Sequence, residues 1–298
     1  MDNFINFYQH LPQYISPAVF SIGRFSIGWY ALSYLLGFIT VYFLLKYRIK
    51  KGEAAKIKNF PLNNDSILNF LIYIFIGLLI GARLGYAIFY NLPYYLQNPL
   101  AIISPFDPVS GEFIGIFGMS YHGGLVGIII ASLIFVKKYK LNFWQLANFA
   151  IPAIPAGYFF GRIGNFFNGE LYGKITDKIW GMYFSSQNFA PAQLRHPSQI
   201  YEAVLEGLLI FLILWPLRNN PKFKNKLLGL YLVFYSIARI IAEFFRQPDE
   251  HIGYITGFLT LGQILSSFML IFGLILIFMV NYKQSESIST NENSSKIY

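Results

Sequence analysis

Seven long apolar stretches constrain this chain more than any other feature of its sequence. They lie at about 25–45, 67–90, 119–136, 145–161, 200–217, 227–245 and 258–281. A helix of about 20 residues crosses a hydrocarbon core of roughly 30 Å, and each stretch is close to that length. Charged residues make up only 12% of the chain, against about 25% in soluble proteins, which excludes disorder and disfavours a cytosolic enzyme. We therefore expect an all-α polytopic membrane protein with about seven transmembrane helices.

The distribution of basic residues predicts how these helices are oriented. Fifteen of the 23 Lys and Arg residues lie in the connections 46–66, 137–144 and 218–226 and after Tyr282, whereas 91–118 and 247–257 have none. Because loops rich in Lys and Arg stay in the cytoplasm, we expect the N-terminus outside and the C-terminus in the cytoplasm. The net charge of +9 then reflects membrane topology, and no nucleic-acid partner is expected.

The sequence predicts one transmembrane catalytic domain, 1–283, and a polar tail. A segment rich in Gly, Asn, Gln and Pro, about 162–199, is expected to form a small external head between the fourth and fifth spans. The tail, 284–298, is expected to be disordered and cytoplasmic. The absence of cysteine excludes disulfides and a cysteine nucleophile. None of the four histidines stands at the spacing of a metal site, so we expect no metal and no cofactor.

Ionisable and polar residues of the spans gather at their outer ends, whereas the inner halves have almost none. An ionisable side chain inside a membrane helix costs about 2.5–3.5 kcal/mol, which makes it a functional candidate. Tyr235, Arg239 and Glu243 are spaced four residues apart and share one helical stripe. The other members are Arg83, His122, Arg162, Asn165, Glu202, Glu206 and Arg246. The pattern predicts one polar site that opens toward the outer leaflet.

Arginine dominates this outward set, and arginine suits bidentate recognition of phosphate or carboxylate. The residues alone leave several functions open. An enzyme acting on an anionic substrate fits, and so does a transporter or flippase, although a transporter needs polar groups that continue toward the inner side. A non-catalytic assembly factor would not explain the clustered Arg, His and Asn. Structural alternatives also exist, such as an ion pair between Arg239 and Glu243 or a structural role for His122.

Four blocks of sequence add a family resemblance. They are SYHGG at 120–124, GRIGNFFNGELYG at 161–173, RHPSQIYE at 195–202 and RIIAEFFRQPD at 239–249, and WY at 29–30 and GARLGY at 81–86 also fit. In this order they resemble the bacterial phosphatidylglycerol–prolipoprotein diacylglyceryl transferase family over roughly residues 15–280. One position departs, because Asn148 stands where the family often has an acidic residue.

The resemblance implies a reaction and its location. The diacylglyceryl group of phosphatidylglycerol moves to the lipobox cysteine thiol of a prolipoprotein signal peptide, a thioether forms and glycerol phosphate leaves. This is the first step of bacterial lipoprotein maturation. The family is described as seven transmembrane helices with a small external head. The implied location is the bacterial cytoplasmic (inner) membrane, with the active site facing the outer, periplasmic leaflet and membrane lipids around it.

The chemistry of this transfer suggests the catalytic residues. Arg162 and Arg239, where the family has essential arginines, are expected to stabilise charge on the leaving phosphate. A thiol of pKa about 8.5 is only slightly ionised at neutral pH, so a base or a positive field must assist its ionisation. His122 is the candidate base, with Tyr235 as its alternative or partner. The field of the arginines is a third possibility.

Other residues are expected to bind the substrate or to support the arginines. The predicted substrate-binding residues are Arg162, Asn165, Asn168, Gly173, Tyr30, Gly123 and Arg246. Of these, the asparagines and the glycine turn at Gly173 would shape the headgroup pocket. Glu170, Glu202 and Glu243 are expected to hold the arginine side chains and compensate their buried charge.

Overall fold

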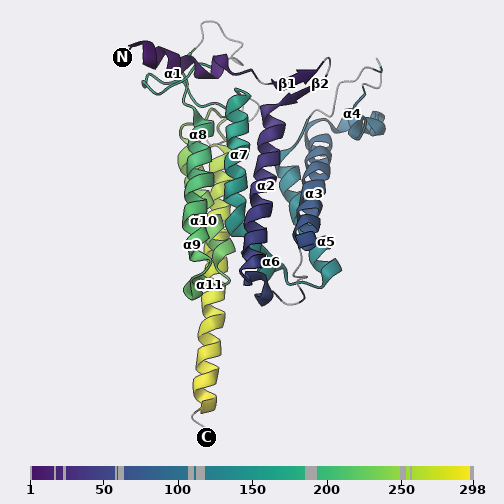
Figure 1. The fold of residues 1–298 in the computed structure, drawn as a ribbon, viewed down its shortest axis with the longest axis vertical. Coiled ribbons are helices and arrows are strands. Elements are labelled where there is room, and N and C mark those ends of the chain that lie inside the picture. The colour runs from purple at the N-terminus through teal and green to yellow at the C-terminus, as the bar shows by residue number, and fades with distance from the viewer. Residues whose placement is uncertain are drawn as a thin grey trace. The chain divides into compact units, whose positions relative to one another are not determined.

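The computed structural model consists mainly of helices (Figure 1). It describes residues 2–16, 18–22, 25–57, 59, 64–106, 111, 118–184, 193–248, 253–255 and 257–295. The chain divides into two compact units, one formed by residues 1–44 and 147–298 and the other by residues 45–146. The second unit is therefore an insertion into the first.

The first unit begins with elements that the sequence analysis does not anticipate. Helix α1 (Asp2–Tyr14) precedes strands β1 (Ala18–Ile22) and β2 (Phe25–Gly28), which form an antiparallel hairpin. Helix α2 (Trp29–Lys50) begins directly after β2. The predicted first span thus starts four residues too early, because a short apolar run fits a strand as well as a helix.

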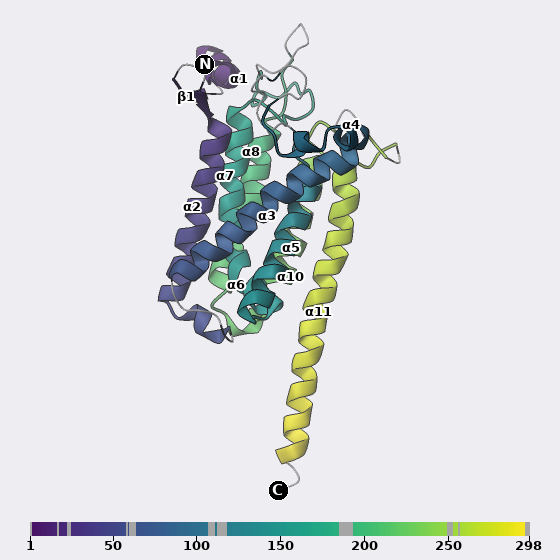
Figure 2. The same cartoon turned by 90° about the vertical axis from the view of Figure 1, so that its right-hand side faces the viewer.

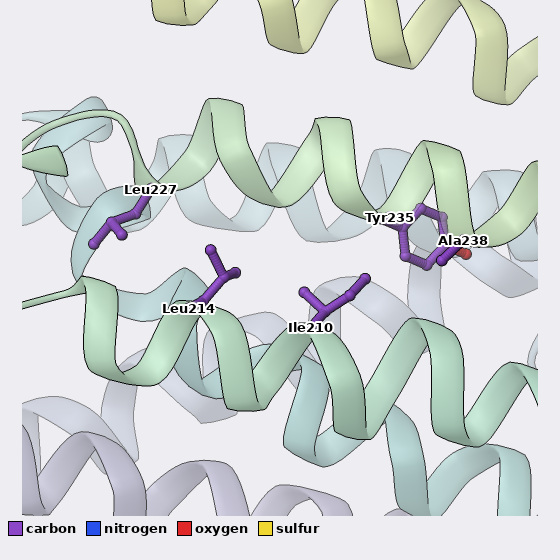
Figure 3. Close-up of a cluster of buried hydrophobic side chains, with 5 residues drawn as sticks. All are labelled: Ile210, Leu214, Leu227, Tyr235 and Ala238. Atoms are coloured by element: carbon purple, nitrogen blue, oxygen red, sulfur yellow. The ribbon is translucent and has the colours of Figure 1, made fainter.

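The remaining helices of the first unit pack around an apolar core. They are α7 (Ile154–Phe167), α8 (Ser198–Glu202), α9 (Ile210–Leu217), α10 (Leu227–Glu243) and α11 (Leu261–Ser295), with a 3-10 turn η5 (Pro221–Phe223) between α9 and α10. Five buried side chains of α9 and α10 form one centre of this core (Figure 3), namely Ile210, Leu214, Leu227, Tyr235 and Ala238. A Cβ atom on Gly229 of α10 would approach the carbonyl oxygen of Gly273 to 3.0 Å, so the small residue lets α10 and α11 lie close together.

The predicted fourth span is interrupted. Helix α6 (Phe143–Ala150) leads through a 3-10 turn, η3 (Ile151–Ala153), into α7. Prolines at positions 152 and 155 explain the break, because proline lacks the backbone N–H of a regular helix. Asn148 has a defined partner: its Oδ1 accepts the backbone N–H of Leu228 at 3.1 Å, at the start of α10. A neutral side chain from α6 therefore caps the start of α10.

The second unit is built on two helices that contact each other through glycine. It contains η1 (Glu53–Lys56), α3 (Asn64–Tyr90), α4 (Leu92–Gln97), η2 (Pro99–Ile102) and α5 (Tyr121–Tyr139). A Cβ atom on Gly81 of α3 would lie 2.4 Å from the carbonyl oxygen of Gly123 on α5. Such closeness is typical of helices packed within a membrane, where small residues let two backbones approach.

Five helical segments of the described chain are long and apolar enough to cross a membrane. They are Trp29–Lys50, Asp65–Tyr90, His122–Tyr139, Ser198–Leu217 and Leu261–Asn281. Each coincides with a predicted span, which supports a multi-pass membrane protein. The two other predicted spans correspond to α7, with 14 residues, and α10, with 17. Both are shorter than the five, and both contain an arginine of the predicted site.

Helix α11 continues past the end of α10 (Figure 2) and reaches Ser295. It therefore includes most of the polar segment 284–298, for which disorder stays a prediction.

The head follows α7 later than predicted, because α7 continues to Phe167. Short backbone pairings hold it, among them Gly173 N–H to His196 O at 2.8 Å. Helix α1 packs against it: the backbone N–H of Tyr183 donates to Gln9 O at 2.8 Å, and Gln9 Nε2 donates to the carbonyl oxygen of Ile179 at 3.1 Å. The head and the first helix of the chain thus form one assembly at the end of α7.

Candidate functional site

A single buried carboxylate organises the polar centre of the first unit. Glu202, the last residue of α8, has no exposed side-chain surface and contacts three guanidinium groups. Its Oε2 lies 2.9 Å from Nε of Arg162, and its Oε1 lies 3.0 Å from Nη1 of Arg239 and 3.3 Å from Nη1 of Arg246. Two of these three arginines are brought from α7 and α10, so the carboxylate joins three elements.

Two further glutamates complete the charge balance around Arg239. Its Nη2 lies 2.7 Å from Oε2 of Glu243, one turn along α10, and its Nη1 lies 3.5 Å from Oε1 of Glu206. Thr260 donates its hydroxyl to Glu243 Oε1 at 3.1 Å. Three arginines and three glutamates therefore face one another, which offsets much of the large cost of burying isolated charges.

The two glutamates at positions 202 and 206 flank an unusual backbone. Residues Ala203–Leu209 form a π-helical segment, η4, between α8 and α9. Such segments are rare and occur often at functional sites. Gly207 in η4 packs on Phe159 of α7, since a Cβ atom there would lie 2.8 Å from the Cα atom of Phe159. This close approach places both carboxylates against α7.

Tyr158 joins the network from α7, and it belongs to none of the four sequence blocks. Its hydroxyl accepts a hydrogen bond from Nε of Arg162 at 2.7 Å and donates to Oε2 of Glu206. The Arg162 guanidinium also lies over its ring, 4.9 Å from Cζ to the ring centroid. The sequence signal that could have identified Tyr158 is its spacing, because it precedes Arg162 by four residues and so shares one helical stripe with it.

A second chain of contacts leads from Arg162 to the head. Arg162 Nη1 donates to Oδ1 of Asn165 at 3.4 Å, and Asn165 Nδ2 donates to Oε1 of Glu170 at 2.7 Å. Gln199 on α8 holds the same turn by donating to the carbonyl oxygen of Glu170 at 2.6 Å. Asn168 caps the C-terminus of α7, its N–H donating to Gly164 O at 3.0 Å. Glu170, which was predicted to hold an arginine, is thus linked to Arg162 through Asn165.

Gly173 fixes the backbone beside Arg246. The two residues form an isolated antiparallel bridge, and a Cβ atom on Gly173 would lie only 2.4 Å from the carbonyl oxygen of Phe245. Arg195 closes this turn, because its Nη1 donates to Gly173 O at 3.2 Å and to Gln247 Oε1 at 3.3 Å. Any side chain at position 173 would displace the strand that carries Arg246.

Tyr235 and Tyr30 lie at the edges of this network. Tyr235 is buried in the apolar cluster of Figure 3, and its ring packs at right angles on Tyr158 with 5.8 Å between centroids. Tyr30, in the first turn of α2, donates its hydroxyl to Tyr34 at 3.0 Å. Its Cα atom is 3.4 Å from where a Cβ on Gly164 would lie, so α2 approaches α7 here.

His122 and Gly123 lie in the second unit, in the first turn of α5. The side chain of His122 is exposed. Ser120 caps this helix, because its Oγ accepts the N–H of Gly123 at 3.2 Å. Gly123 has a packing role, since a Cβ atom on it would lie 2.3 Å from the carbonyl oxygen of Gly81. That contact alone accounts for a glycine at position 123.

Arg83 is occupied by backbone carbonyls within the second unit. Its Nε donates to Ile102 O at 2.7 Å, its Nη2 to Ala101 O at 2.6 Å and its Nη1 to Gly118 O at 3.3 Å. These contacts connect α3 with η2 and the approach to α5, so Arg83 has a structural explanation. Asp249, the last residue of the RIIAEFFRQPD block, lies outside the described residues.

The arginines form the accessible side of the cluster in the first unit. The side chains of Arg162 and Arg239 are each 13% exposed, whereas those of Glu202 and Glu206 are fully buried. Within the part of the chain that the structure describes, Nη2 of Arg162 and Nε of Arg239 have no protein partner. The buried carboxylates thus hold two arginines that keep unused guanidinium N–H groups, an arrangement suited to binding a phosphate. No group of three or more His, Asp or Glu side chains among the described residues could hold a metal ion.

Comparisons with known proteins agree in their result. Residues 17–279 match the family model described as prolipoprotein diacylglyceryl transferase. A phosphatidylglycerol–prolipoprotein diacylglyceryl transferase of Chlorobaculum tepidum is 43% identical over 277 residues, which are 92% of this chain and 93% of the relative. The corresponding proteins of Campylobacter hominis (42% over 271 residues, 90% and 92%) and Desulfotalea psychrophila (43% over 277 residues, 91% and 95%) are similar over the same extent.

Proposed function

The chain belongs to the prolipoprotein diacylglyceryl transferase family, and on that basis we propose how its buried arginines and glutamates serve the reaction. It is a transferase that moves the diacylglyceryl group of phosphatidylglycerol to prolipoproteins, the first step of lipoprotein maturation. The acceptor is the thiol of the lipobox cysteine in the signal peptide, which becomes a thioether as glycerol phosphate leaves.

The enzyme spans the bacterial inner membrane seven times, with its N-terminus outside, its C-terminus inside and its active site in the outer leaflet. The asymmetry of Lys and Arg between the loops supports this orientation. The two crossings outside the five apolar spans are the fourth and the sixth along the chain, α7 and α10, and both are shorter than those five. Ion pairing supports these two, because each of their arginines contacts a buried glutamate of α8.

Arg162 and Arg239 bind the phosphate of phosphatidylglycerol and stabilise the charge that develops on it as the carbon–oxygen bond breaks. The supporting observation is that both guanidinium groups contact the two oxygens of one carboxylate, Glu202, and still have unused N–H groups on the accessible side. Preorganised donors of this kind need no reorganisation during the reaction. Glu202 and Glu243 hold the pair in place and compensate its charge.

The thiol proton must leave as sulfur attacks the glycerol carbon. One carbon–sulfur bond forms, one carbon–oxygen bond breaks, and the proton passes through a base to the leaving phosphate monoester. His122 is the better candidate for this base, because its imidazole is exposed at the start of α5. Tyr235 is buried against Tyr158 and the apolar cluster, which favours an indirect role.

The remaining residues shape the headgroup pocket. Asn165 and Glu170 form a hydrogen-bonded link from Arg162 to the head, and they orient the glycerol hydroxyls. Asn168 and Gly173 hold the turns on either side of Glu170, and Arg246 adds a third positive charge. Tyr30 lines the path of the lipid, whereas Gly123 serves the packing of α5 on α3.

A reconstitution tests the whole proposal. The purified protein is mixed with phosphatidylglycerol and a lipobox peptide, and the peptide is examined by mass spectrometry. We expect a diacylglyceryl adduct on cysteine that disappears when the peptide carries serine instead. Translocation of labelled lipid by folded protein that forms no adduct would contradict the proposal and indicate a transporter.

A further inference from the structure

Tyr158 makes contacts that the transfer reaction does not by itself require. We propose that Tyr158 is a positioning residue for Arg162, which sets the orientation in which this guanidinium meets the lipid phosphate. The inference rests on the proposed function, in which Arg162 binds that phosphate.

Tyr158 restrains the Arg162 guanidinium along an edge and across a face. The hydroxyl accepts the Nε–H at 2.7 Å, and the ring lies beneath the planar group at 4.9 Å. An edge contact fixes rotation of the guanidinium within its plane, and a face contact fixes the tilt of that plane. A carboxylate alone, such as Glu202 at 2.9 Å from the same Nε, leaves the tilt free.

The hydroxyl of Tyr158 is itself held from below. It donates its hydrogen to Oε2 of Glu206, which is fully buried, so a lone pair of the phenol oxygen points toward Arg162. The ring cannot swing aside easily, because Tyr235 packs against it at right angles. Gly207 and Phe159 bring η4 and α7 into direct contact at the same level. Tyr158 is therefore a fixed reference point for the arginine.

Without this hydroxyl, Arg162 has a competing arrangement. Arginine and carboxylate groups prefer a bidentate contact in which two N–H groups face two oxygens. Glu206 is linked to Arg162 through Tyr158, because the phenol hydroxyl donates to one oxygen of the Glu206 carboxylate. Loss of the hydroxyl would free that oxygen and let Arg162 turn its Nη groups inward. The Nη–H groups that bind the phosphate would then pair with a glutamate instead, and the affinity for the lipid would fall.

The test compares Tyr158→Phe with Tyr231→Phe, which removes a phenol hydroxyl from a half-buried tyrosine of α10 that packs against the same apolar cluster. Initial rates are measured in the reconstituted transfer assay while phosphatidylglycerol and the lipobox peptide are varied separately. We expect Tyr158→Phe to raise the KM for the lipid by about 10-fold, as for a misplaced binding group. The KM for the peptide should stay near wild type, and Tyr231→Phe should change neither.

A double-mutant comparison separates positioning from general packing. Lysine has no guanidinium group for Tyr158 to orient. Adding Tyr158→Phe in an Arg162→Lys background should therefore have no further effect on the KM for the lipid. Equal losses in both backgrounds would overturn the inference, as would an unchanged KM in Tyr158→Phe. If the wild type and Tyr231→Phe form no adduct, the proposed function fails instead.

An isosteric replacement keeps the test valid should Tyr158→Phe fold poorly. 3,5-Difluorotyrosine at position 158 keeps the shape and the hydroxyl but makes the phenol oxygen a weaker acceptor. We expect a higher KM for phosphatidylglycerol without a change in melting temperature. An unchanged KM in this protein would refute the role of the hydroxyl.

Discussion

Glu202→Gln is expected to damage the first unit more than the same change at any other glutamate of the cluster. The carboxylate uses both oxygens as acceptors, one for Arg162 and the other for Arg239 and Arg246. Glutamine replaces one oxygen with an NH₂ group, which is a donor. Whichever way the amide turns, a donor then faces at least one guanidinium, and three arginines are left with two buried glutamates.

The size of the effect follows from this geometry. Removal of one partner from a buried ion pair costs about 3–5 kcal/mol. Glu243→Gln should cost about 1–3 kcal/mol, because glutamine can accept from Arg239 and donate to the hydroxyl of Thr260. At roughly 2–4 °C per kcal/mol, Glu202→Gln should lower the melting temperature by roughly 6–20 °C. Glu243→Gln is thus a matched control with the same chemical change.

Thermal unfolding in detergent measures both variants, first without added lipid. Phosphatidylglycerol or diacylglycerol, which has no phosphate, is then added. Glu202→Gln leaves the cluster with one excess positive charge, so the anionic lipid should restore more stability to this variant than to the wild type. Equal melting temperatures for the two variants would refute the central place of Glu202. Equal rescue by diacylglycerol would refute the role of phosphate.

Four further outcomes follow from the same structure. Arg162→Ala and Arg239→Ala should each reduce transfer below detection while the protein still inserts, and full activity in both would contradict a phosphate clamp. His122→Asn should slow turnover and flatten the acidic limb of the pH–rate profile, whereas an unchanged profile would assign proton removal elsewhere. Gly123→Ala should cost about 1–3 kcal/mol by overpacking against α3, seen as a lower melting temperature with unchanged KM values in the fraction that stays folded. Burial of its ring lowers the pKa of His196 in the head below the usual value of about 6.5. The unfolded head therefore binds more protons below that pH, and the folded head loses stability as the pH falls. The protection of its amides against hydrogen exchange should weaken from pH 7.5 to 5.5, and His196→Gln should remove the difference.

The membrane helices could be predicted from the sequence because span length is a local property. Each of the seven apolar stretches contains a helix in the structure, although the boundaries shift. The head was predicted to begin at residue 162, but α7 continues to Phe167. Its glycine and asparagine residues are typical of a loop in isolation. In the folded chain, Gly164 packs against Ser33 of α2, so tertiary contact extends the helix.

The polar site was predictable only in part. Arg162, Arg239 and Glu243 stand out because ionisable residues are rare in apolar segments. Glu206 stands out for the same reason, and in the structure its Oε1 lies 3.5 Å from Nη1 of Arg239. Tyr158 could not be selected, because a tyrosine in a membrane helix carries no charge and has many ordinary roles. Its importance depends on the π-helical segment η4, and no local sequence pattern predicts that backbone.

Two helices are not among the five segments that are long and apolar enough to cross a membrane, and these two supply arginines of the site. Helices α7 and α10 are short, and the same residues that interrupt their apolar character, Arg162 and Arg239, bind a common carboxylate from α8. Arg239 also pairs with Glu243 on its own helix, but the carboxylate paired with Arg162 comes from α8, and this Glu202 joins both arginines. The cost of burying these charges is therefore offset fully only when the elements of the cluster assemble. The features that weaken these segments as independent spans are the features that require them to assemble around a charged centre, which is the centre that we propose binds an anionic lipid headgroup.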